Sequence, residues 1–177
     1  MTPTEHYTRV ADDFGRTLDG VTDWAARTPC DEWDARELAR HVVDTHHRVL
    51  ARVTGGEPAA LDDGADVVPA WTEARAAMAR ALEENGDTEV DVWGQPAPFS
   101  QLVDGLLCAD TLLHTWDLAR ATKQDDTLDL ESVAKAHAFL TPMGDAMRRP
   151  GGFGAEVPVE ADASPQDRLL GFAGRQP

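Results

Sequence analysis

The stretch SQLVDGLLCADTLLHTWDLARAT, residues 100–122, decides how this chain folds. Its apolar side chains recur every three to four residues, which predicts an amphipathic α-helix. With successive residues set about 100° apart, Asp110, His114 and Asp117 fall within the apolar face. The opposite side is polar and carries Asp104, Thr111 and Thr115. The pattern therefore predicts a helix that places two carboxylates and an imidazole among buried side chains.

Such a buried pair of Asp110 and His114 needs a chemical reason. An ionised carboxylate buried without a partner costs roughly several kcal/mol, so it must be paired, protonated or bound to a cation. An aspartate and a histidine four residues apart on a helix can offer oxygen and nitrogen to one metal ion. A hydrogen-bonded Asp–His pair in a closed core is an equally valid interpretation of these two residues alone.

A third ligand is expected from the helix predicted at residues 34–53, which carries His41, His46 and His47. His47 points away from the inward stripe of this helix. His41 and His46 flank the stripe on its two edges, and the periodicity does not choose between them. The inward stripe consists of Leu38, Val42, Thr45, Val49 and Val53.

Two further polar residues have two interpretations each. Asp117 either orients a ligand imidazole from behind or forms a salt bridge with Arg48 or Arg120. Arg48 either contacts an anionic substrate or is an ordinary solvated arginine. His6 has no evident partner in the sequence, and His137 is expected on the apolar side of its helix.

The rest of the chain is also predicted to be helical. A carboxylate at Asp34 followed by Glu37 indicates a capping box at the start of the second helix. Residues 28–33 form a loop, and residues 87–98 form a long extended crossover. Pro142 should kink or split the last long helix. Helices are expected at residues 4–23, 34–53, 69–84, 100–122, 129–149 and 166–172.

Composition limits the class of protein. The 177 residues fit one domain, residues 1–177, and the net charge of −16 argues against nucleic acid or an anionic membrane as a partner. No run reaches the ~18 apolar residues of a spanning helix. Cys30 and Cys108 form no disulfide or CxxC pattern, and the N-terminus has no signal-peptide pattern, so we expect a cytoplasmic protein.

Three stretches resemble a known family. TPCDEWDARELARH, residues 28–41, is similar to a segment of the actinobacterial DinB-like metal-binding proteins, and DTLLHTWDLARAT, residues 110–122, is similar to their metal-binding helix. The ending SPQDRLLGFAGR, residues 164–175, resembles their closing segment. These proteins are related to the metal-binding domain of mycothiol-dependent maleylpyruvate isomerase.

The resemblance implies an all-α fold, a DinB-like four-helix bundle with a long crossover and short additional C-terminal helical segments. It implies that His41, Asp110 and His114 hold a divalent metal ion, with aspartate where relatives carry glutamate. Zinc is expected foremost, with nickel or iron as alternatives. The residues after Arg149 are too few for the isomerase's additional C-terminal domain, so the resemblance predicts the site rather than isomerisation of maleylpyruvate.

The function expected from this site is a metal-dependent thiol transferase or related enzyme, with mycothiol as cosubstrate. Its partners would be a small-molecule thiol and an electrophile. One alternative is a non-catalytic, stress-associated metal-binding module that forms a homodimer through its helical faces. Another is a metal-dependent hydrolase that uses bound water.

Overall fold

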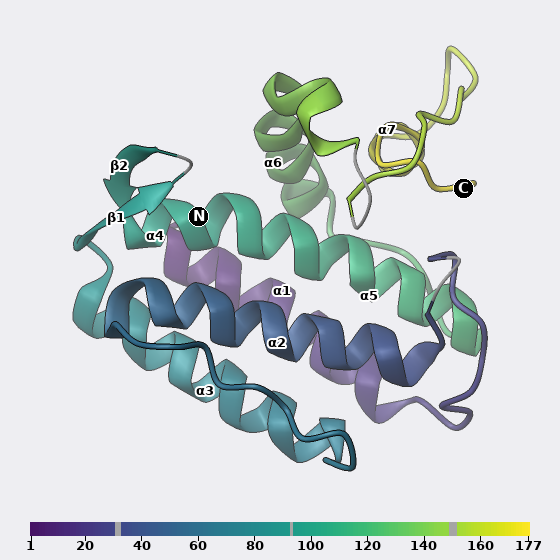
Figure 1. The fold of residues 1–177 in the computed structure, drawn as a ribbon. Helices are drawn as coiled ribbons and strands as arrows, with labels where there is room; N and C mark the ends of the chain where they lie inside the picture. The colour runs from purple at the N-terminus through teal and green to yellow at the C-terminus, as the bar shows by residue number, and fades with distance from the viewer. Residues whose placement is uncertain (31–32, 93, 149–151) are drawn as a thin grey trace.

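The computed structural model describes residues 1–30, 33–92, 94–148 and 152–177, and most of these residues are helical (Figure 1). Four long helices form a bundle, in which α1 and α2 each contact both α3 and α5. The bounds are α1 Pro3–Asp19, α2 Ala35–Thr54, α3 Val67–Asn85, β1 Glu89–Val92, β2 Gln95–Pro98, α4 Phe99–Leu102, η1 Val103–Leu107, α5 Cys108–Thr122, α6 Leu130–Leu140, η2 Thr141–Met147 and α7 Pro165–Phe172. The expected all-α, DinB-like architecture is confirmed.

The predicted capping box of α2 is present. The Asp34 carboxylate accepts a hydrogen bond from the Glu37 backbone N–H, and the Glu37 carboxylate accepts one from the Asp34 N–H, both at 2.9 Å. These bonds satisfy two backbone N–H groups at the helix N-terminus, which fixes where α2 starts. His41 therefore lies in the second turn of a firmly anchored helix.

Two helix boundaries and the structure of the crossover differ from the sequence-based expectation. α1 ends at Asp19 rather than at residue 23, because Gly20 caps it. α3 begins at Val67 rather than at residue 69, because the Asp66 side chain accepts a hydrogen bond from the Val68 N–H. The crossover contains an antiparallel hairpin of β1 and β2, with Glu89 opposite Pro98. Trp93, which the sequence placed in this crossover, lies outside the described residues.

The helix expected at residues 100–122 is present but is not a uniform α-helix. A π-helical turn, η1, separates the short α4 from α5. A π-turn inserts an extra residue into the helical repeat, so it rotates α5 relative to the residues before it. The orientation of Asp110 and His114 therefore depends on η1 as well as on the 3.6-residue period.

The polar side predicted for the helix at residues 100–122 is wrong for two of its three residues. Thr111 is 1% exposed and Thr115 is 5% exposed, while Asp104 is half-buried. The reason is tertiary: α5 contacts α1 and α2 on one side and α6 on another, so it is enclosed nearly all round. The Thr115 hydroxyl donates to the Thr111 backbone carbonyl, which lets a polar side chain sit in this core.

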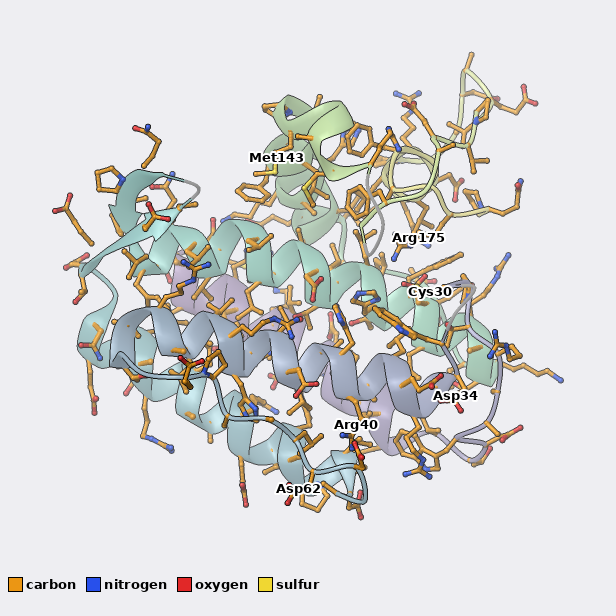
Figure 2. All side chains as sticks on the ribbon, in the orientation of Figure 1. Cys30, Asp34, Arg40, Asp62, Met143 and Arg175 are labelled. Carbon is orange, nitrogen blue, oxygen red and sulfur yellow. The ribbon has the colours of Figure 1, made fainter. Side chains whose placement is uncertain are left out.

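The C-terminal part covers the outer side of α5. α6 ends at Leu140 and continues as the 3-10 segment η2, which confirms the predicted interruption at Pro142. Arg149, the expected end of this helix, lies outside the described residues. α7 packs against α6, and the chain then returns toward α5 through Arg175 (Figures 1 and 2). No helix among the described residues is both long and apolar enough to cross a lipid bilayer.

Candidate metal centre

The structure brings His41, Asp110 and His114 together between α2 and α5. His41 Nε2 lies 3.6 Å from Asp110 Oδ1, and His114 Nε2 lies 3.7 Å from the same oxygen. The two imidazole rings face each other edge to face, with centroids 4.9 Å apart. One ligand atom from each residue lies within 4.8 Å of the other two. Three donors from two helices therefore converge on one point.

The electrostatics of this point favour a positive charge. Burial alone would lower the pKa of His114, but the charge of Asp110 and the hydrogen bond to Asp117 outweigh it and raise this pKa to about 10. Burial raises the pKa of Asp110, yet the neighbouring charge of His114 outweighs it and brings this pKa down to about 2. Without a metal the site thus holds a protonated imidazole between carboxylates.

Asp117 holds the far side of the His114 ring. Its Oδ2 accepts a hydrogen bond from His114 Nδ1 at 3.0 Å, which leaves Nε2 aimed at Asp110. A carboxylate behind a ligand histidine fixes the tautomer and the orientation of the ring. Asp117 therefore contacts the His114 imidazole, as expected, while the role of His114 as a metal ligand stays a prediction.

The salt-bridge partner of Asp117 is neither Arg48 nor Arg120. Arg175, near the end of the chain, donates to Asp117 Oδ2 at 2.7 Å and to Oδ1 at 3.2 Å. Arg120 pairs with Asp126 instead. Sequence reasoning missed Arg175 because 58 positions separate it from Asp117, and no local periodicity connects two such residues.

Cys30 also contacts Asp117, on the Nδ1 side of the His114 ring. Its Sγ is 3.4 Å from Asp117 Oδ2 and 3.8 Å from Arg175 Nη2 (Figure 2). Cys30, His114 and Asp117 also satisfy the spacing of a metal-binding group. However, the Arg175 guanidinium already neutralises the Asp117 carboxylate, so a second cation would be repelled there. The His41–Asp110–His114 group is the better candidate.

Trp33 forms the outer wall of the site. Its ring centroid is 4.5 Å from that of His41 and 5.8 Å from that of His114. The Thr28 hydroxyl donates to the Trp33 backbone carbonyl at 2.8 Å, which holds the loop before α2 against the bundle. Trp33 therefore packs beside both histidine rings, a contact that the residue pattern alone did not assign.

The structure separates His41 from His46. His41 faces Asp110, whereas His46 is 1% exposed and points to the other side of α2, where its ring contacts Tyr7 and Trp71. His46 Nδ1 donates to the Val42 backbone carbonyl at 2.8 Å. Burial lowers the pKa of His46 to about 4, so its ring is neutral. Packing thus places His41, rather than His46, beside Asp110 and His114, and metal binding by His41 stays a prediction.

The other histidines lie away from the centre. His47 contacts the Ala59 backbone carbonyl, and His137 is half-buried against the ring of Phe172, at an edge rather than in the core. His6 is buried and its Nδ1 lies 2.8 Å from Asp104 Oδ1. The partner of His6 is 98 positions away, which is why the sequence did not reveal it.

The residues present fit a divalent cation. Asp110 Oδ2 is buried and has no hydrogen-bond partner among the described residues, and a buried carboxylate oxygen normally has one. Two imidazole nitrogens and one carboxylate oxygen are the donor set of many catalytic zinc sites, which keep a coordination position open. A small cavity of about 40 Å³ adjoins Asp110 and His114 and is closed by Met147, Phe153 and Arg175.

The fold and this site together define a helical-bundle protein with a candidate His–Asp–His metal centre. The chain belongs to the family of the mycothiol maleylpyruvate isomerase N-terminal domain, whose family model matches residues 5–119. That match includes all three candidate ligands and Asp117, whereas Arg175 lies beyond it.

Two proteins from Mycobacterium tuberculosis are similar to this chain over nearly its whole length. Each is called an uncharacterized protein, one from strain CDC 1551 / Oshkosh and one from strain ATCC 25618 / H37Rv. Each is 32% identical over 190 residues, which cover 99% of this chain and 98% of the relative. No solved structure matches the chain significantly.

Proposed function

We propose that this protein is a metal-dependent transferase that activates mycothiol or a similar low-molecular-weight thiol. The observation that carries the proposal is the convergence of His41, Asp110 and His114 within 4.8 Å, beside a cavity that leaves room for a fourth ligand. Family membership supports the choice of thiol, because the matching family model is named for mycothiol chemistry.

A divalent cation at this site would favour the thiolate over the thiol at neutral pH. The residues of the chain supply the rest. Asp117, fixed by Arg175, holds the His114 ring so that Nε2 keeps its direction, and the Trp33 ring packs against the ring of His41. In an addition to a carbon–carbon double bond, the thiol loses its proton, its sulfur bonds to one carbon as the π bond breaks, and a proton goes to the neighbouring carbon. No electrons are exchanged with a further reagent.

Loss of the ligands should abolish metal binding. Asp110→Ala and His114→Ala should each lose the metal found in wild-type protein purified without an affinity tag, while their far-UV circular dichroism stays helical. Elemental analysis measures the metal, and Asp126→Ala serves as a control carboxylate outside the site. Equal metal content in wild type and both variants would remove the basis of the proposal.

A thiol-consumption assay then tests the reaction. Wild type with a mycothiol-type thiol and an electrophile should consume both in a one-to-one ratio, and His114→Ala should not. Turnover that is independent of thiol would instead favour a metal-dependent hydrolase. Metal binding without any turnover across a panel of electrophiles would favour the non-catalytic module.

A further inference from the structure

A second hollow lies next to the candidate metal centre. It has a volume of about 300 Å³ and lies between α2, the hairpin strand β1 and the helical run that leads into α5. Leu106 lines both this groove and the small cavity beside Asp110 and His114. The groove is lined by Thr45, Arg48, Val49, Arg52, Asp91, Val92, Leu102 and Leu106.

The groove carries an unbalanced positive charge. Arg48 and Arg52 lie one turn apart on α2, and like charges at this spacing repel each other. No carboxylate within the described part of the chain lies within salt-bridge distance of either guanidinium, although the sequence has 32 acidic and 16 basic residues. Both side chains are exposed to solvent, and the lining holds one carboxylate, Asp91, against the two arginines, so it keeps a net positive charge in an otherwise acidic chain.

Thr45 connects Arg48 to the candidate metal centre. The Thr45 hydroxyl donates to the His41 backbone carbonyl at 2.9 Å and accepts from Arg48 Nη2 at 2.6 Å. The same hydroxyl oxygen is 3.4 Å from His41 Nε2. One side chain therefore separates the guanidinium from the imidazole, and the hydroxyl holds the otherwise exposed Arg48 side chain at the wall of the groove.

We propose that this groove binds the anionic group of a small substrate, a carboxylate or a phosphate, through Arg48 and Arg52. The planar guanidinium donates two parallel hydrogen bonds to either group, which fixes the orientation of the ligand. The reactive end would then point past Leu106 toward His41 and Asp110. That direction rests on the proposed function, whereas anion binding itself does not.

Calorimetric titration of the full chain with succinate and with methyl phosphate tests the groove. At least one anion should bind saturably, and Arg48→Gln with Arg52→Gln should weaken its affinity roughly tenfold or more. Arg80→Gln, which removes an exposed arginine of α3, is the matched control and should leave the affinity unchanged. Asp91→Asn removes the one carboxylate of the groove lining and should strengthen binding.

The opposite results would overturn the inference. In the first, neither anion binds saturably. In the second, Arg80→Gln loses as much affinity as the double arginine variant. The anion that binds identifies the ligand group as carboxylate or phosphate. Metal analysis of the same samples separates the two proposals: His114→Ala should lose metal yet bind the anion, and the double arginine variant should keep the metal. Wild type that binds the anion but no metal would contradict the proposed function alone.

Discussion

Asp117 is fully buried, and its carboxylate oxygens contact His114, Arg175 and Cys30. Burial would raise its pKa, but the charge of Arg175 and the hydrogen bond from His114 hold this pKa well below its usual range. The carboxylate is thus ionised in the core and balances a buried guanidinium. Such a pair is costly to break, because removing one partner leaves the other charge uncompensated.

Replacing Asp117 by asparagine should therefore destabilise the protein strongly. The free energy of unfolding, measured in urea, should fall by about 3 to 5 kcal/mol, because Arg175 would remain buried without a counter-charge. Asp126→Asn removes the partner of the exposed Arg120 and should cost roughly 0 to 1 kcal/mol. Similar losses in the two variants would show that Arg175 has access to water.

His46 should make stability depend on pH. Its pKa is about 4 in the folded chain because burial disfavours the charged ring, and it returns to about 6.5 on unfolding. The unfolded chain thus binds the proton more tightly between these values. The contribution is fully present above pH 6.5 and decreases as pH falls toward 4, by roughly 3 kcal/mol in total.

Urea unfolding at several pH values checks this, because His46→Leu should flatten the slope of stability against pH between 4 and 6.5. An NMR titration of the His46 ring in the folded wild type provides a second measurement, which does not depend on how well the variant folds. A ring that titrates near 6.5 in the native state would contradict the expectation.

Among the elements, α7 shows how the C-terminal part is held. A Cβ added at Gly171 would lie 2.6 Å from the Val157 backbone carbonyl oxygen. This neighbour is backbone, so it cannot move aside as the end of a flexible side chain could. The Val157 N–H also donates to the Gly171 carbonyl at 2.9 Å, so the segment before α7 follows the helix closely. Arg175 follows Gly171 within the same C-terminal segment, so we expect this packing to help position its guanidinium.

Gly171→Ala should accordingly lower the free energy of unfolding by about 1 to 3 kcal/mol, the usual cost of overpacking. Gly64→Ala is the matched control, because nothing lies within 4 Å of a Cβ added there. It should be neutral or slightly stabilising by up to about 1 kcal/mol. Urea unfolding of both variants measures the difference in their free energies of unfolding. Equal free energies would mean that the contact at residue 171 relaxes without cost.

At the scale of the whole molecule, the net charge of −16 should oppose folding by self-repulsion. Screening at 0.3 M salt shortens the Debye length to below about 8 Å, so the melting temperature at pH 7 should rise with sodium chloride. The same salt should have little effect near pH 4.5, the isoelectric point. Thermal unfolding at both pH values measures the difference, and an equal effect of salt at both would assign it to something other than net charge.

The amino-acid sequence by itself determined the local features of this protein. The periodicity of residues 100–122, the Asp34–Glu37 capping box and the interruption at Pro142 act within a few residues, so each can be identified from neighbouring side chains. Asp110 and His114 were identified in the same way, because they interrupt an apolar face. The resemblance, rather than periodicity, selected His41.

Only the tertiary structure decided what surrounds those residues. It enclosed Thr111 and Thr115, which the helical pattern alone had assigned to a polar side, because α1, α2 and α6 all pack against α5. It also brought Arg175 to Asp117 and turned His46 away from the candidate metal centre. These contacts join segments far apart in the chain. Their physical cause is the packing of whole helices, which a periodic pattern within one helix does not contain.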